Sequence, residues 1–213
     1  MGLTAKNSGG DFELAPVGNH PAVCVGVIDL GMQTSEYQGT TSIKHQCRID
    51  WELPTQLMDD GRPFTISKFY TVSTGEKSNM ARDFQAWRGR DFTEAEAQAF
   101  DVFTVAGKAC LLNCVGYQKL NKDKGVKVAS ISPLPKEMKA SVSTVTNPIV
   151  KFALEDYNNG DQDAIDAFEG LSDWFKDTIK KAHNFGSTET IPDNIGQPQE
   201  VNVEPDFNDE IPF

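Results

Sequence analysis

The chain has 213 residues, a formal net charge of −11 and 38% hydrophobic residues, a composition typical of a soluble globular protein. This length suits one medium domain with an appendage, or two small domains. No apolar run of about eighteen residues occurs, which argues against a membrane span, and the first ten residues lack the apolar core of a secretion signal. We therefore expect a cytoplasmic protein without membrane contact.

The net negative charge arises entirely from the C-terminal third of the chain. Residues 140–213 hold 15 acids and 4 bases, whereas residues 1–139 hold 16 of each. From Gly186 onward there are 7 acids and no base, among Pro, Asn, Gln and Thr residues. This composition predicts a disordered acidic tail. The net charge therefore does not exclude nucleic-acid binding by the neutral remainder.

The cysteines show no metal-binding or redox motif. None of the four belongs to a CxxC pair, and the three histidines do not stand at ligand spacing from them. We interpret them as reduced core residues and expect no metal and no cofactor. They are Cys24, Cys47, Cys110 and Cys114.

Three strands are expected in the first part of the chain, after a flexible arm over residues 1–18. A long β-branched run over 20–34 predicts the first strand. Residues 41–54 and 62–73 alternate apolar and polar positions, which predicts two half-buried strands with charged outer faces. In this alternation Trp51 belongs to the core.

The spacing of apolar residues then changes to that of a helix. Residues 76–90 predict a helix that ends at Gly89, and Thr93 with Glu96 forms a capping box that opens a second, short helix. Strands return over two segments, 107–120 and 126–134. Three strands, a helix and two strands are the order of the OB-fold. The expected fold is therefore mainly β: a five-stranded Greek-key barrel with a helix between strands three and four.

A small helical region is expected next. Asn147-Pro148 predicts the start of a helix over 149–159, and apolar residues at steps of three and four predict further helices, with Ser172 as a possible cap. The chain is thus divided into four expected regions: a flexible arm (1–18), an OB-fold domain (19–139), a helical region (140–185) and a disordered acidic tail (186–213).

Cationic and aromatic residues gather where OB-folds bind oligonucleotides, on the face of strands two and three and in two flanking loops. Cations that follow phosphates and aromatics that stack on bases make a sequence-tolerant single-strand site. The alternative is a purely structural role, in which the lysines are solvated and the aromatic residues belong to the core. The predicted DNA-binding residues are Tyr37, Lys44, Arg48, Arg62, Lys68, Tyr70, Lys119, Lys122, Lys124 and Lys127.

Catalytic constellations are absent from the sequence. It has no nucleophile elbow, phosphate-binding glycine loop or metal-binding carboxylate triad. The acidic pairs Asp50 with Glu52 and Asp59 with Asp60 are typical of strand-edge and turn charge. We therefore expect a protein that is not an enzyme.

Four segments, "GVIDLG", "WELP", "SKFYTVSTGEKSNMARDFQAWRGRDFT" and "GKACLLNC", together resemble a family of small phage-encoded single-stranded DNA-binding proteins with an OB-fold. The resemblance covers roughly residues 18–135. In its most distinctive stretch, "FQAWRGRDFT", Trp87 is expected to pack the helix, and Arg88 and Arg90 to form a basic helix exit that joins the DNA-binding set. Residues 147–184 have no counterpart in bacterial single-stranded DNA-binding proteins.

The closing "DEIPF" resembles the tip of bacterial single-stranded DNA-binding proteins. That resemblance implies a docking peptide for replication and recombination enzymes. An apolar ring and a proline that restricts the backbone suit binding in a pocket, and acids attract basic surfaces. The predicted partner-binding residues are Asp206, Asp209, Glu210, Ile211, Pro212 and Phe213.

The resulting hypothesis is a single-stranded DNA-binding protein in the cytoplasm of a bacterial host. It would coat and protect single strands during phage replication and recombination, and recruit enzymes through its acidic tip. Two alternatives remain open: an adaptor whose OB barrel binds protein, and a mediator that anneals single strands.

Overall fold

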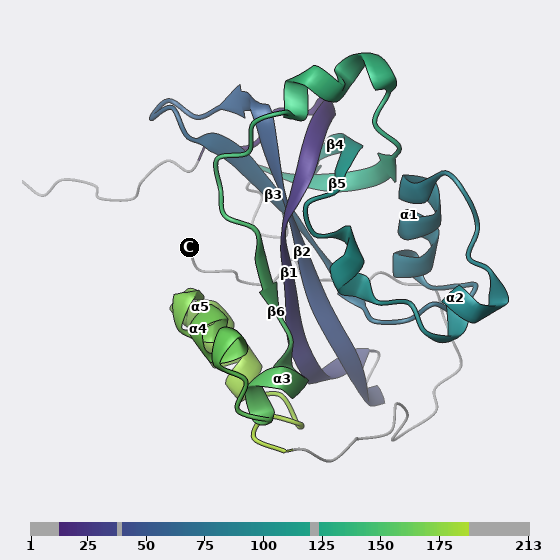
Figure 1. The fold of residues 1–213 in the computed structure, drawn as a ribbon, viewed down its shortest axis with the longest axis vertical. Coiled ribbons are helices and arrows are strands. Elements are labelled where there is room, and N and C mark those ends of the chain that lie inside the picture. The colour runs from purple at the N-terminus through teal and green to yellow at the C-terminus, as the bar shows by residue number, and fades with distance from the viewer. Residues whose placement is uncertain (1–12, 38–39, 120–123, 188–213) are drawn as a thin grey trace, which may run out of the picture.

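The computed structural model describes residues 13–37, 40–119 and 124–187 (Figure 1). It is mainly β, as expected, with one sheet in the order β3-β2-β1-β4-β5 and a short β6 that pairs with β1. The first five strands pair antiparallel, and β6 runs parallel to β1. The strands are β1 (Gly18–Tyr37), β2 (Thr40–Leu57), β3 (Pro63–Thr71), β4 (Ala109–Gln118), β5 (Lys124–Ser132) and β6 (Val150–Phe152).

The sheet is open between its two edge strands. Among the described residues, no hydrogen-bonded ladder joins β3 to β5. The expected strand, helix and strand order is confirmed. Of the expected acidic tail (186–213), residues 188–213 lie outside the described residues.

Helices occupy the connections and the C-terminal region. Ser78 caps α1, Gly89 ends it in the left-handed conformation, and the predicted capping box of Thr93 and Glu96 opens α2. The α-helices are α1 (Asn79–Arg88), α2 (Glu94–Gln98), α3 (Leu154–Asn158), α4 (Gln162–Gly170) and α5 (Asp173–Lys180). Two 3-10 helices are η1 (Val102–Val105) and η2 (Lys136–Val142).

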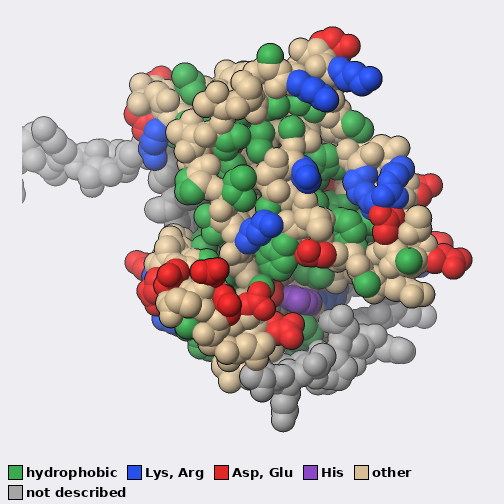
Figure 2. Space-filling model, viewed as in Figure 1, with side chains coloured by type: hydrophobic (Ala, Val, Ile, Leu, Met, Phe, Trp, Pro, Cys, Tyr) green, Lys and Arg blue, Asp and Glu red, His purple; other side chains and the backbone are tan. Residues whose placement is uncertain are grey.

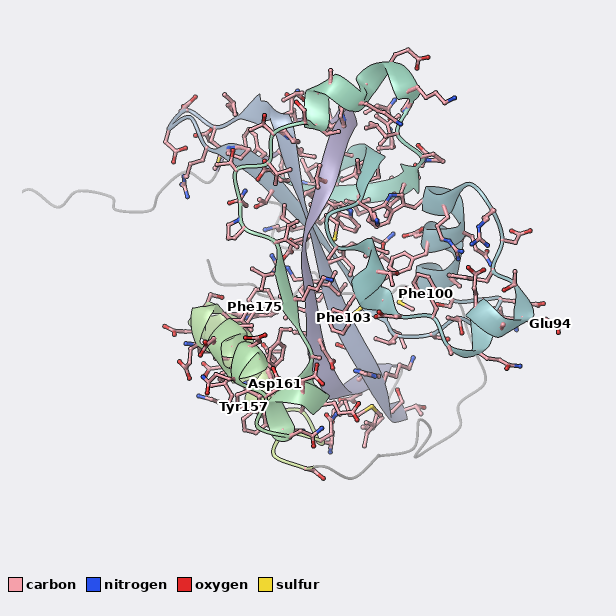
Figure 3. All side chains as sticks on the ribbon, in the orientation of Figure 1. Glu94, Phe100, Phe103, Tyr157, Asp161 and Phe175 are labelled. Atoms are coloured by element: carbon pink, nitrogen blue, oxygen red, sulfur yellow. The ribbon has the colours of Figure 1, made fainter. Side chains whose placement is uncertain are left out.

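Two apolar cores lie on opposite sides of the sheet. The larger core holds Trp51 and packs against α1, whose Trp87 donates its indole N–H to the Ala109 carbonyl at 2.9 Å. The smaller core lies between β1 and the C-terminal helices and includes Phe168 and Ile179. Figure 3 shows the same division, with Phe100 on the α1 side and Tyr157 and Phe175 in the helical layer.

The predicted helix over 149–159 is wrong in its first part. Residues 150–152 form β6, and only Leu154–Asn158 is helical. The reason lies in β1, whose pairing with β4 ends at Val23, so that β6 takes the vacated edge at Gly26–Ile28. An unpaired strand edge favours such pairing over an isolated helical turn.

A buried and a partly buried carboxylate fasten the C-terminal region to the sheet. Glu52, fully buried on β2, accepts from the backbone N–H of Thr146 at 2.9 Å and of Asn147 at 2.7 Å. Asp29 on β1 accepts from the Leu154 N–H at 3.2 Å. Gly31 has φ +75°, and a Cβ there would lie 2.5 Å from the Leu154 side chain. The segment before β6 is therefore tied to β2, and α3 is packed directly on β1.

Candidate nucleic-acid interface

A groove lies between the N-terminal arm and the β4–β5 hairpin, and we call it the hairpin groove. Tyr117 of β4 lies against the backbone of Gly125 of β5, where an added Cβ would be 2.6 Å from its ring carbons. The groove has a volume of about 470 Å³. Its lining residues are Leu14, Ala15, Val17, Gly116, Tyr117, Gln118, Lys124, Gly125 and Val126.

The hairpin groove combines an apolar wall with positive charge. Leu14 and Val17 are exposed apolar side chains, and Lys124 is an exposed cation of the lining. The ammonium of Lys127 lies 5.8 Å from the centre of the Tyr117 ring. Among the described residues that line the groove, none is acidic. An aromatic ring beside cations fits a stacked base and its phosphate.

The predicted cation Arg48 has a different environment. Its guanidinium donates to Asp50 Oδ1 at 2.6 Å and to Ser67 Oγ at 2.7 Å. Its centre lies 4.6 Å from the Phe175 ring and 5.6 Å from the Phe69 ring. Arg48 is therefore on the outer face of β2, as expected, but its charge is already paired and α5 lies over it.

Lys68 and Tyr70 belong to the core side of β3, and the expectation that Lys68 lies on the outer face is wrong. Lys68 Nζ lies 2.7 Å from Asp83 Oδ2, and Tyr70 donates its hydroxyl to the same oxygen at 2.9 Å. Tyr70 is 2% exposed, and burial, with the Asp83 charge, raises its pKa well above the usual value. A phenol in this position has no face for a base.

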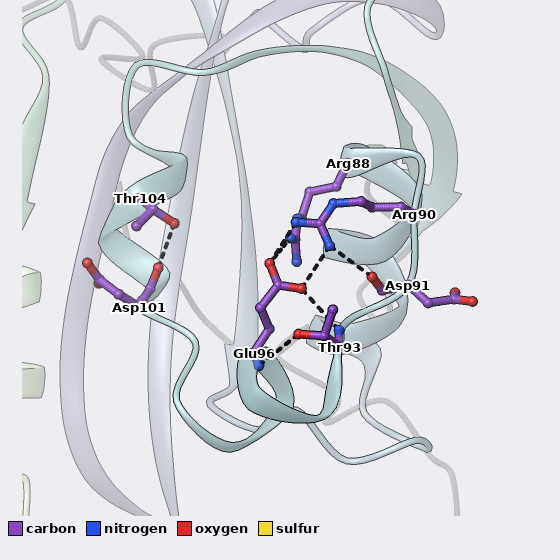
Figure 4. A network of polar contacts seen from close by, with 7 residues as sticks. All are labelled: Arg88, Arg90, Asp91, Thr93, Glu96, Asp101 and Thr104. Carbon is purple, nitrogen blue, oxygen red and sulfur yellow. Dashed lines mark hydrogen bonds and ion pairs between the residues drawn. The ribbon is translucent and has the colours of Figure 1, made fainter.

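Arg88 and Arg90 converge on one carboxylate (Figure 4). Arg90 donates to the Glu96 carboxylate at 2.7 and 2.8 Å, Arg88 bonds the same group, and Glu96 accepts from the Thr93 N–H at 3.0 Å. The hydrogen bonds from Arg90, then those from Thr93 and Arg88, lower the pKa of Glu96 below its usual range. Glu96 thus balances one of the two positive charges of the basic helix exit and holds both guanidinium groups in place.

A larger groove of about 900 Å³ lies beside this network. It is mostly apolar, with Phe84, Trp87 and Phe100 from the α1 side and Pro133 and Leu134 after β5. This groove does not include the hairpin lysines.

The remaining predicted DNA-binding residues are dispersed. Lys44 is exposed on β2, Lys119 is half-buried just after β4, and Arg62 lies before β3 with its guanidinium 2.7 Å from Asp60. Tyr37 is the last residue of β1, where a loop was expected. Lys122 lies outside the described residues. So do all six residues of the predicted tip: Asp206, Asp209, Glu210, Ile211, Pro212 and Phe213.

Sequence reasoning missed Tyr117 and the aromatic residues Phe69 and Trp174. Tyr117 could have been found, because it stands in a strand next to a lysine-rich turn. Trp174 lies 6.0 Å from Phe69, ring centre to ring centre, although the two are far apart in the sequence. No local pattern reports such a contact.

The cysteines behave as predicted for buried thiols. All four are free and buried, and burial raises the pKa of Cys24 and Cys47 from 9.0 to about 12. Within the part of the chain that the structure describes, no group of His, Cys, Asp and Glu could hold a metal ion. No helix in that part is long and apolar enough to cross a membrane.

Comparison with known proteins adds no relative. No protein-family model matches this chain, and no curated protein matches it significantly.

Proposed function

We propose that the chain is a non-enzymatic single-stranded DNA-binding protein whose main contact is the hairpin groove. The observation that carries the proposal is the Tyr117 ring beside Lys124 and Lys127, next to an apolar wall formed by Leu14 and Val17. Stacking on such a ring is worth about 1–3 kcal/mol per base and tolerates any sequence. Lysines add affinity by displacing counterions from phosphates.

The strand order supports an OB-type barrel as the scaffold. The order β3-β2-β1-β4-β5, with α1 between β3 and β4, is that of a five-stranded OB barrel opened between β3 and β5. In this fold the β4–β5 loop borders the oligonucleotide site. The proposal thus places the ligand at the hairpin and gives β2 and β3 a smaller share than the sequence suggested.

The same proposal assigns the tip to protein partners. Ile211, Pro212 and Phe213 follow two acids in a segment without a base, a chemistry that suits a basic, apolar pocket on a replication or recombination protein. Coating of single strands in a phage-infected bacterium, with recruitment through the tip, is the role that we infer from the resemblance and from this chemistry.

Fluorescence anisotropy of a labelled oligo(dT) tests the proposal. A strand of about 16 nucleotides covers the usual site of one OB fold. We expect binding that weakens steeply between about 50 and 200 mM salt, and a weaker response to a duplex of the same length. Absence of binding at the lowest salt would contradict the proposed function.

A protein-binding adaptor is the second candidate. The observation in its favour is the apolar groove of about 900 Å³ beside α1, which suits side chains of a peptide better than phosphates. The same titration separates the two, because an adaptor gives no anisotropy change with oligo(dT).

A further inference from the structure

Three aromatic residues meet on the outer face of β3, where the helical layer contacts the sheet. Phe69 comes from β3, and Trp174 and Phe175 come from the first turn of α5. The Trp174 ring centre lies 6.0 Å from that of Phe69 and 5.1 Å from that of Phe175, both edge to face. The Arg48 guanidinium lies over both phenylalanine rings, 5.6 Å from the centre of Phe69 and 4.6 Å from that of Phe175. We call these four residues the α5 cluster.

Trp174 of the α5 cluster is half-buried, whereas the other two tryptophans are buried. Trp51 and Trp87 are 0% and 7% exposed and belong to the larger core on the other side of the sheet. Trp174 is partly exposed and lies at the rim of the smaller core, to which Phe69 and Phe175 contribute. It is therefore the tryptophan that solutes at the β3 face can reach.

Arg48 contacts the rings of the cluster, but its own charge is already paired and is not available to a phosphate. Its guanidinium is fixed by Asp50 and Ser67, as described above, and is flanked by Phe69 and Phe175. A phosphate would have to break these hydrogen bonds to reach it. The cluster consequently offers ring surface that is held in place, which suits a planar apolar ligand such as an unpaired base.

We propose that Trp174 stacks on a base of the bound strand, so that α5 extends the DNA-binding surface beyond the barrel. This inference rests on the proposed function, since a ligand of unpaired bases is assumed. It assigns a binding role to the helical region, for which neither the sequence nor the resemblance offered one. Stacked bases on aromatic side chains need no sequence match, in keeping with a coating protein.

The acids of the helical layer limit where the phosphates run. Glu155, Asp163, Asp166, Asp173 and Asp177 are exposed on α3–α5, and Figure 2 shows acids gathered over this part of the surface. Asp173 and Asp177 stand on the same helix as Trp174. The sugar-phosphate backbone of the bound DNA must therefore pass on the side of the cluster away from α5, with the base turned toward Trp174.

Tryptophan fluorescence and oligonucleotide anisotropy test the inference on the full chain. With two of the three tryptophans buried, oligo(dT) is expected to quench wild-type emission mainly at Trp174. Trp174→Ala is expected to weaken binding about 5- to 150-fold, the range for the loss of one stacked base. Trp174→Phe keeps a ring, so affinity is expected to stay within about threefold while the quenching disappears.

Two further variants act as controls. Asp173→Asn with Asp177→Asn removes nearby repulsion, and binding is expected to tighten at low salt and to equal wild type at high salt. Lys136→Gln with Lys139→Gln, on exposed residues of η2, should leave the quenching unchanged. Circular dichroism melting of each variant shows that the fold is intact, and Trp174→Phe serves where Trp174→Ala unfolds.

The outcomes separate this inference from the function on which it rests. If wild type does not bind oligo(dT) at all, the proposed function fails. If wild type binds, and Trp174→Ala leaves the affinity unchanged, the function stands and the inference is overturned. Tighter binding by a folded Trp174→Ala also overturns it, because α5 would then cover the strand site.

Discussion

The cations of β2 and β3 and those of the β4–β5 hairpin are in opposite situations. Arg48 and Lys68 are enclosed by carboxylates and aromatic rings, whereas Lys124 and Lys127 stand exposed beside the hairpin groove. All four were candidate DNA-binding residues in the sequence, Arg48 and Lys68 as polar positions in alternating strands and the two hairpin lysines as part of a lysine-rich turn. The comparison teaches that a lysine or arginine in a strand is a candidate phosphate ligand when its side chain stays exposed in the folded chain.

The largest expected difference concerns stability. Lys68→Ala leaves the Asp83 carboxylate, 7% exposed, without its ammonium partner, and is expected to lower the free energy of unfolding by about 3 kcal/mol. Lys124→Ala removes an exposed charge and is expected to change it by less than about 0.5 kcal/mol. Urea unfolding of both variants measures the contrast, and equal effects would erase the distinction between the two groups of cations.

The next effect concerns binding at the hairpin. Tyr117→Ala is expected to weaken oligo(dT) binding by about 2 kcal/mol, because it removes the ring on which a base stacks. Tyr117→Phe keeps the ring and is the matched control, with an expected change below about 0.5 kcal/mol. Anisotropy at one fixed salt concentration gives both values. A large loss in the Phe variant would show that the hydroxyl, rather than the ring, makes the contact.

Arg48 sharpens the comparison because its side chain is as little exposed as that of Lys68, 17% against 16%, although it lies on the outer face of β2. Arg48→Gln is expected to lower the free energy of unfolding by about 1.5 kcal/mol, since hydrogen bonds from a charged group to Asp50 and Ser67 are lost or weakened. Its salt dependence of oligo(dT) binding should equal that of wild type. A slope reduced by about 0.7 would instead identify Arg48 as a phosphate contact.

The smallest expected effect is at Glu96. Its pKa is lowered, so its interaction with Arg88 and Arg90 stabilises the fold above the unfolded value of 4.5 and is lost only as the pH falls through the lower folded value. Glu96→Gln should therefore leave DNA binding at neutral pH unchanged and remove this part of the acid dependence of stability. A steeper salt slope in the variant would show that the released arginines reach the strand.

Local features were predictable from the sequence because neighbouring residues determine them. The capping box at Thr93, the left-handed Gly89 and the alternation that buries Trp51 all depend on contacts within a few positions or on a strand's own period. The order of strands and helices followed from the same signals. The alternation of β3 also placed Lys68 on the side of Tyr70, so its core-side position was readable in principle.

The remaining features depend on contacts between distant parts of the chain. The start of β6 was missed because the edge that it fills becomes vacant only when β4 leaves β1 after Val23. The enclosure of Arg48 depends on Phe175, which the helical layer brings over β2. Neither contact produces a periodic pattern in the sequence. Because the structure pairs Arg48 and Lys68 with carboxylates, the candidate site now lies at the hairpin and not on the face of β2 and β3.

The most direct test of the hairpin groove is the salt dependence of oligo(dT) affinity in two charge-matched double variants. Lys124→Gln with Lys127→Gln removes two cations at the groove, and Lys136→Gln with Lys139→Gln removes two exposed cations of η2. The account predicts that the hairpin variant reduces the slope of log affinity against log salt by about 1.4. It predicts that the η2 variant keeps the wild-type slope. Equal slopes in the two variants would contradict binding at the hairpin groove.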